Sequence, residues 1–249
     1  MSTSTLKLLI VYMILSCAAP LWAEETAEEA PEPRWTGKAG LAFLATSGNT
    51  DNQTLGLDFT ADRRPDLWGL SLKASFNQAE EDGVTTAERY LVGARVKRAI
   101  EDKPWELFLG LSAEQDEFAG IDRRTVAELG GLWRAIEKDK HKLSVDLGLT
   151  WTDEDRIDPE VDTDAVGALL GFTYAWKLSE TATFNERLLF YPNFDESDDW
   201  RLEYTVGVTA ALTDRLGLEV GFDLRYRNEP IGDADDTDTT TKVALVANF

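Results

Sequence analysis

Residues 241–249, TKVALVANF, carry the pattern that decides the fold of this chain. Side chains alternate between the two faces of a β-strand. One face of this segment is apolar throughout and consists of Val243, Leu245, Ala247 and Phe249. The other face carries Lys242 and Asn248. A strand that ends a chain leaves an open edge unless another strand pairs with it, so the segment predicts a sheet that closes on itself.

The same alternation recurs in eleven earlier runs, which are separated by turn residues. Short connections follow the even-numbered runs, whereas most connections after the odd-numbered runs are longer and acidic. This arrangement is typical of outer-membrane barrels, whose short turns lie at the periplasmic end. The predicted strands are 35–47, 53–62, 67–78, 86–98, 105–114, 124–136, 141–152, 165–177, 182–191, 200–212, 216–227 and 239–249.

Three features favour a membrane barrel over a soluble protein. Strand glycines fall on the polar face, except Gly37 and Gly131, and a crowded interior explains this preference. A closed soluble barrel of this size would have an interior too wide to fill. Tryptophans are sorted by strand end, as in interfacial girdles. Those predicted at the periplasmic end are Trp35, Trp68, Trp105, Trp133 and Trp176, and those at the other end are Trp151 and Trp200.

We therefore predict an all-β fold, a single antiparallel up-and-down transmembrane barrel of about twelve strands. A soluble twelve-stranded sandwich remains the alternative. Two runs fit the barrel poorly. Glu186 falls among apolar residues on the predicted lipid face, where a charge is costly, and a bulge or a parity error would account for it. Gly37 and Ala39 give the first run a weak outward face.

The first 23 residues are predicted to be a secretory signal peptide. Lys7 precedes an apolar run at 8–19 that is too short to span a bilayer, and Ala23 offers a cleavage point. Residues 14–17 also weakly resemble a lipoprotein cleavage box. Residues 24–34, EETAEEAPEPR, are predicted to be a disordered acidic lead-in to a barrel domain at 35–249. Because the signal holds one Lys and no acid, the net charge of −21 becomes −22 after cleavage, which argues against nucleic acid as a partner.

A short motif follows the first predicted strand and consists of Ser47, Gly48, Asn49, Thr50 and Asp51. The motif suits a tight turn, and a hairpin turn without any further role is sufficient to explain it. It also resembles the Ser-Gly-Asn-Thr signature of a bacterial outer-membrane family, domain of unknown function 481, whose members are often labelled salt-induced. Residues 35–37 and 55–57 and the final Phe249 fit the same pattern, so the resemblance covers about residues 35 to 249.

The resemblance implies an outer-membrane β-barrel with no established activity and no catalytic residues to carry over. It also implies that the terminal strand acts as the signal that the outer-membrane assembly machinery reads. The residues of this assembly signal are Val243, Leu245, Ala247 and Phe249.

The sequence offers little for catalysis. His141 is the only histidine, and its parity points it away from the lumen. Hydrolases generally need a histidine base beside a nucleophile, so we expect no enzyme, no cofactor and no defined metal site. A hydrolase that uses carboxylates alone remains an alternative. The predicted loops hold 24 Asp and Glu against two Lys and Arg; they could loosely bind divalent cations, although a solvated surface explains them as well.

The predicted lumen has a mixed charge, with fourteen basic and nine acidic side chains on the inward face. Such groups either pair and close the barrel or line a narrow aqueous pore, and parity does not choose between these arrangements. The candidate lumen charges that we single out are Lys73, Arg95, Glu106, Glu128, Asp146, Arg201, Glu203, Glu219, Asp223, Arg225 and Lys242.

The predicted function is that of an integral barrel of the cell outer membrane, which serves as a narrow solute channel or as a structural protein of envelope and osmotic stress. The expected partners are outer-membrane lipid, lipopolysaccharide and the assembly machinery, and the expected state is a monomer. A secreted soluble β-sheet protein that binds a ligand is the first alternative. An outer-membrane hydrolase is the second.

Overall fold

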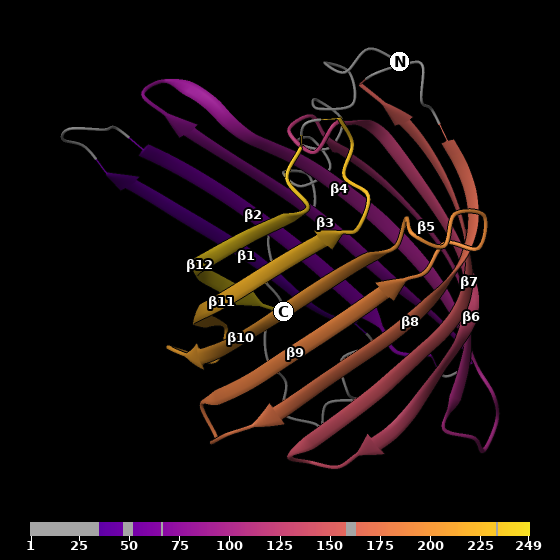
Figure 1. The fold of residues 1–249 in the computed structure, drawn as a ribbon. Helices are drawn as coiled ribbons and strands as arrows, with labels where there is room; N and C mark the ends of the chain where they lie inside the picture. Colours follow the sequence, from indigo (N-terminus) through magenta and orange to yellow (C-terminus); the bar gives the residue numbers. More distant parts are fainter. Residues whose placement is uncertain (1–34, 47–51, 66, 158–162, 233) are drawn as a thin grey trace.

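The structure, a computed structural model, describes residues 35–46, 52–65, 67–157, 163–232 and 234–249. These residues form one closed antiparallel barrel in which every strand pairs with its neighbours in sequence and the last pairs with the first (Figure 1). No helix in these ranges is long and apolar enough to cross a membrane. The strands are β1 (Trp35–Thr46), β2 (Asn52–Arg63), β3 (Trp68–Glu81), β4 (Val84–Ala99), β5 (Trp105–Asp116), β6 (Ile121–Glu137), β7 (His141–Arg156), β8 (Thr163–Lys177), β9 (Ala182–Tyr191), β10 (Arg201–Ala211), β11 (Leu216–Arg227) and β12 (Thr237–Asn248).

The twelve predicted strands are confirmed, but the connections at one end are shorter than predicted. We call the end where β1 begins and β12 finishes the turn end, and the opposite end the loop end. Residues 79–85 were expected to form a longer acidic connection, yet β3 and β4 continue to a two-residue turn at Asp82 and Gly83. Both residues have positive φ, 51° and 76°, as a type I′ hairpin turn requires. The strands lengthen because charged residues can stay in the ladder once they lie beyond the apolar band.

The charged faces of the strands point into the barrel, and the apolar faces point out. Ion pairs join Arg225 on β11 to Asp116 on β5, and these strands are not neighbours, so the pair must cross the interior. On the other face, Phe43 and Leu129 remain 65% and 61% exposed. A sheet with its polar face inside and its apolar face outside is suited to a lipid environment and not to water.

Interior crowding explains the glycines on the polar face. A Cβ on Gly130 would lie 2.6 Å from the ring of Phe108, and one on Gly148 would lie 3.3 Å from the same ring. These two glycines leave room for an aromatic side chain that fills the lumen. Gly131, on the outer face, has no such neighbour within 3.7 Å of a Cβ position.

The barrel closes at a seam, the β1–β12 ladder. The ladder runs from the Lys38–Asn248 pair to the Ala42–Ala244 pair. At the turn end the Phe249 carbonyl accepts a hydrogen bond from the Gly37 amide at 2.8 Å, and the Gly37 carbonyl accepts one from the Phe249 amide at 3.1 Å. The predicted closure of the sheet is therefore confirmed. The Phe249 ring covers Gly37 and lies 6.1 Å from the Phe59 ring, which fills the weak outward face of β1.

Glu186 lies on the outer face as its parity indicated, and neither a bulge nor a parity error is involved. The ladders of β9 with β8 and β10 run through this residue without a register shift. The Tyr204 hydroxyl donates a hydrogen bond of 2.9 Å to its carboxylate. This donor partly replaces the hydration that the carboxylate loses at a lipid-facing position.

The tryptophans lie near the strand ends that the sequence indicated. Trp35, Trp68 and Trp105 begin β1, β3 and β5, while Trp133 and Trp176 lie close to the ends of β6 and β8. The rings of Trp105 and Trp133 stack at 5.9 Å. Toward the loop end, Trp151 is exposed on β7, and Trp200 packs on Phe190 and Tyr226 at 5.6 and 4.9 Å. Their role as interfacial girdles stays a prediction.

Candidate functional site

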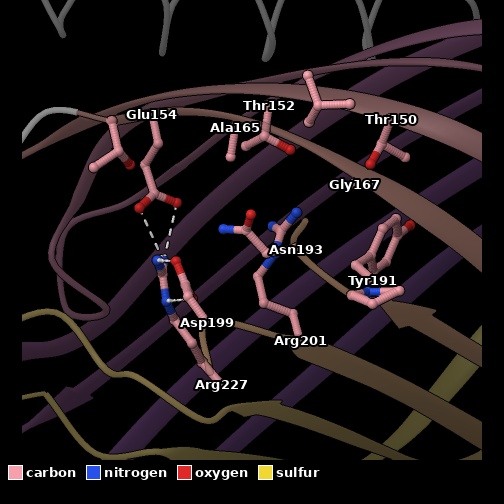
Figure 2. Close-up of a pocket in the computed structure, with 13 residues that line it drawn as sticks. Thr150, Thr152, Glu154, Ala165, Gly167, Tyr191, Asn193, Asp199, Arg201 and Arg227 are labelled. Carbon is pink, nitrogen blue, oxygen red and sulfur yellow. Dashed lines mark hydrogen bonds and ion pairs between the residues drawn. The ribbon is translucent and has the colours of Figure 1, made fainter. Parts of the chain in front are cut away.

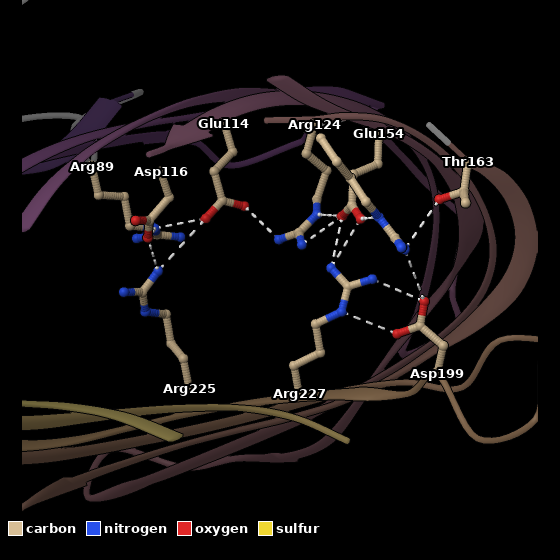
Figure 3. Close-up of polar contacts among 10 residues, drawn as sticks. Arg89, Glu114, Asp116, Arg124, Glu154, Thr163, Asp199, Arg225 and Arg227 are labelled. Atoms are coloured by element: carbon tan, nitrogen blue, oxygen red, sulfur yellow. Dashed lines mark hydrogen bonds and ion pairs between the residues drawn. The ribbon is translucent and has the colours of Figure 1, made fainter. Parts of the chain in front are cut away.

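An ionic network crosses the lumen near the loop end (Figure 3). Arg225 contacts Asp116 at 2.7 Å, and Arg227 contacts both carboxylate oxygens of Glu154 at 3.0 Å. Both arginines project from β11, whereas their partners lie on β5 and β7 on the facing side of the barrel. We call this set the loop-end network; its members are Arg89, Glu114, Asp116, Arg124, Glu154, Arg156, Asp199, Arg225 and Arg227.

Glu154, like Glu114, contacts three arginines of the loop-end network. The Glu154 side chain is 3% exposed and contacts Arg124 at 2.6 Å, Arg156 at 2.9 Å and Arg227 at 3.0 Å. Arg124 also reaches Glu114 at 3.2 Å. A buried charge is tolerated only when it is paired and hydrogen-bonded, and here Glu154 pairs with three guanidinium groups that also contact Glu114 or Asp199.

A second cluster fills the middle of the lumen beside strands β4–β7. We call these four strands the wall. Arg95 lies between Glu128 and Asp146, at 2.9 and 2.7 Å, and its guanidinium sits 4.0 Å over the Phe108 ring. Phe108 in turn packs in an apolar cluster with Leu169 and Leu189. These apolar side chains were not among the candidate lumen residues. Their position on the polar face of their strands was the available signal.

Toward the turn end and at the seam, further candidate charges are paired. Arg134 binds Glu106, and Lys38 binds Glu219. Lys242 on β12 contacts Asp58 at 3.2 Å and Asp223 at 3.1 Å, which links β2 to β11 across the seam.

Three of the candidate lumen charges make no direct ion pair within the described residues. Arg201 stacks over the Tyr191 ring at 5.1 Å, and Lys73 and Glu203 line a cavity. The side-chain arrangement therefore brings most, but not all, of the predicted charges together.

The space left inside the barrel includes cavities of about 360, 60 and 30 Å³. The smallest is lined by the Glu154–Arg227 pair on one side and by Thr150, Tyr191 and Arg201 on the other (Figure 2). The largest is bordered by strands on both sides of the seam, and six basic and six acidic residues line it. A solute in any of these spaces meets both signs of charge.

A loop covers part of the mouth of the barrel. Ile231, in the β11–β12 connection, is only 7% exposed. It packs against Gly120, where a Cβ would lie 2.8 Å from the Ile231 side chain and where φ is +76°. Glycine is suited to both the conformation and the close approach. The contact joins the β11–β12 connection to the β5–β6 turn and lines the cavity of about 60 Å³.

The described residues hold no cluster of three or more metal-ligating side chains. His141 lies on the outer face, where Nδ1 is 2.8 Å from the Tyr174 hydroxyl and the ring stacks on Trp176 at 5.7 Å. It is therefore remote from the lumen carboxylates. The motif at 47–51, the signal peptide at 1–23 and the lead-in at 24–34 lie outside the described residues.

A closed twelve-stranded antiparallel barrel with a charged lumen and an apolar exterior defines the class of integral outer-membrane β-barrel proteins. Within that class, the family profile described as "Protein of unknown function, DUF481" matches residues 39–249. The chain belongs to this family, as its motif and final strand indicated. The comparison with curated proteins finds no match.

Solved structures with a similar fold include a NanC porin, with 11% identity, coverage of 86% of this chain and 97% of the porin, and a TM-score of 0.47. The translocator domain of the autotransporter NalP from Neisseria meningitidis has 9% identity, coverage of 89% and 90%, and a TM-score of 0.48. A KdgM porin in complex with disordered oligogalacturonate has 10% identity, coverage of 86% and 96%, and a TM-score of 0.43. These likenesses concern the fold alone.

Proposed function

We propose that the protein is a narrow channel of the bacterial outer membrane for small polar solutes. The observation that carries this proposal is a lumen that is lined by ionised side chains and keeps internal cavities, the largest of about 360 Å³. Charged walls favour hydrated, polar solutes over apolar ones. Side chains lie between neighbouring cavities. The passage of a solute from one cavity to the next therefore depends on the motion of these side chains.

The loop-end network and Ile231 are the proposed constriction. Arg225 and Arg227 cross the lumen, and Ile231 covers the adjacent cavity. Ion pairs that cross a lumen limit the size of a solute and present it with alternating charge. The channel is therefore expected to pass ions and small polar molecules slowly.

Reconstitution in planar lipid bilayers tests the proposal. We expect discrete conductance steps, and we expect them to grow when Arg227 is replaced by Ala, because this substitution removes the side chain that crosses to Glu154 and also binds Asp199. Lys177→Ala is the matched control, since this basic residue is exposed at the turn end. A purified, folded barrel that gives no steps with either variant would contradict a channel.

The same cross-barrel ion pairs support a second candidate, a closed structural barrel of the envelope. Pairs such as Arg225–Asp116 brace opposite sides of the lumen and need no solute. In this case the wild type and Arg227→Ala give no conductance, while loss of the protein weakens cells at high or low osmolarity. The bilayer experiment separates the two candidates.

The expected surroundings are outer-membrane lipid and lipopolysaccharide, with insertion by the assembly machinery and a monomeric final state. Cell fractionation combined with heat-modifiable gel mobility tests these expectations. Recovery of the protein in the soluble periplasmic fraction would favour the secreted ligand-binding alternative. Retention of any hydrolytic activity in His141→Ala would remove the usual histidine mechanism from the hydrolase alternative.

A further inference from the structure

The seam is paired along only part of its length. Beyond the Ala42–Ala244 pair, residues Phe43–Thr46 of β1 have ladder partners on β2 alone. The residues of β12 from Thr237 to Val243 have partners on β11 alone. Among the described residues, the loop-side half of the seam is therefore a gap between two strand edges.

A gap of this kind is tolerated in a membrane only where the unpaired backbone borders water or protein, because lipid satisfies no backbone hydrogen bond. The cavity of about 360 Å³ meets this condition. Thr240 and Lys242 of the unpaired β12 edge line it, whereas on β1 it is lined by Lys38 and Gly40 in the paired part of the ladder, so the cavity borders the gap on its β12 side. Its volume falls within the range of about 300–1,000 Å³ that is usual for ligand pockets.

The rim of the gap is apolar on both faces of β1. Phe43 points outward and is 65% exposed, and Leu44, which shares the lumen-facing parity of Lys38, is 61% exposed. Val243 of β12 is 56% exposed on the outer face. A lumen-facing leucine that remains so exposed at an opening suits contact with an alkyl chain rather than with a polar solute.

Two basic groups that line the cavity lack an ion-pair partner in the part of the chain that the structure describes. No carboxylate oxygen of the described residues contacts the Lys73 ammonium, and Nε of Arg187 is buried without a hydrogen-bond partner. The carboxylates that act on Lys73 electrostatically are Glu203 and Glu128, and Glu128 is already paired with Arg95. Among the carboxylates that act on Lys73, Glu203 is the one without an ion pair in the described residues, so Lys73 and Arg187 together carry one more positive charge than Glu203 balances.

We propose that the seam gap and the cavity behind it form a lateral binding site for a single-chain anionic amphiphile. Its anionic head binds Lys73 and Arg187 inside the barrel, and its alkyl chain passes between Leu44 and Val243 into the bilayer. This site does not depend on conduction through the barrel. It gives the lumen an entrance from the membrane in addition to any entrance from its ends.

The test uses purified full-length barrel in a neutral maltoside detergent with labelled dodecyl phosphate as the probe. Inorganic phosphate serves as the probe without a chain. We expect saturable binding of dodecyl phosphate and weak binding of inorganic phosphate. Lys73→Gln and Arg187→Gln should each reduce the affinity for dodecyl phosphate by about tenfold, as expected from the loss of a charged hydrogen bond.

A disulfide staple tests the route. Continuation of the seam register would place Phe43 opposite Val243, so the pair Phe43→Cys and Val243→Cys should close the gap when oxidised. The matched control is Leu41→Cys with Leu245→Cys, which are already opposite each other in the ladder. Oxidation of the first pair should abolish binding of dodecyl phosphate, and oxidation of the second should leave binding unchanged.

Several outcomes would overturn the proposal. Binding that survives the closed staple, or equal binding of inorganic phosphate, would mean that the gap is not the route for a chain. Disulfide-linked dimers from the Phe43 and Val243 variants would mean that the gap is an interface between two copies. If the stapled protein does not fold, Leu44→Trp narrows the same gap without a cross-link, and unchanged binding in that variant would contradict the lateral route.

Discussion

The wall and the seam of this barrel hold strands together in different ways. In the wall, the β6–β7 ladder extends from Ile121–Arg156 to Glu137–Lys142, and buried ion pairs and Phe108 fill the lumen beside it. At the seam, the ladder stops at Ala42–Ala244, and the Lys242 bridges and the Phe249 ring support it. A hairpin turn sets the register within the wall, whereas the seam joins strands from opposite ends of the domain. The seam therefore depends on a few anchoring side chains.

This difference predicts that equivalent substitutions cost more stability in the wall than at the seam. The comparison uses the free energy of unfolding, measured by urea titration of the protein in phospholipid vesicles. Each substitution below removes one kind of interaction from one of the two regions.

Glu154→Gln should have the largest effect. It leaves Arg124, Arg156 and Arg227 with one fewer negative charge in a site where the Glu154 side chain is 3% exposed. Removal of one partner from a buried ionic network typically costs about 3–5 kcal/mol. Glu180→Gln, at an exposed position in the β8–β9 turn, is the control and should leave stability unchanged. Equal stability of the two variants would mean that the loop-end network is hydrated and adds little.

Phe108→Ala should cost about 3 kcal/mol, because it removes a ring that is 2% exposed and leaves a cavity beside Leu169 and Leu189. The same substitution should widen the lumen, so bilayer recordings should give larger conductance steps than the wild type. Phe172→Ala provides a comparison on the outer face of β8, where lipid can fill the space. A loss of stability without any change in conductance would place the constriction elsewhere.

Lys242→Gln tests the corresponding ionic contact at the seam. Lys242 links Asp58 and Asp223, whose side chains are 40% and 29% exposed, so water can replace part of the lost interaction. We expect a loss of about 1.5 kcal/mol, at the lower end for a hydrogen bond to a charged group. Lys242→Arg should retain most of the stability. A loss as large as that of Glu154→Gln would remove the proposed difference between the wall and the seam.

The sequence predicted the strands and their faces because both depend on local alternation. The faces are strongly specified, since a one-residue error would turn every side chain of a strand to the opposite face. Glu186 illustrates this point, since its parity was right even though its charge argued against it. Contacts across the lumen were not predictable. The meeting of Arg225 with Asp116 depends on strand tilt and barrel width, which no single strand encodes. The early end of the seam ladder is likewise a property of the closed sheet.

The sequence carries one further signal about the lumen. Phe108, Leu169 and Leu189 are large apolar residues on otherwise polar strand faces, and in the structure they meet on one side of the lumen. Parity alone would have marked each of them as an exception. Their mutual contact required the arrangement of β5, β8 and β9, which is a tertiary property.

Gly37→Ala should have the smallest effect, and it tests how much the packing of the Phe249 ring stabilises the seam. The added methyl group would overlap the Phe249 ring, so the ring must move away from Gly37 and Phe59. Loss of that aromatic packing should cost about 1 kcal/mol. Gly131→Ala is the matched control, because this outer-face glycine has its nearest neighbour 3.7 Å from a Cβ position. Equal stability of the two variants would show that hydrogen bonds between Gly37 and Phe249 hold the seam without help from the ring.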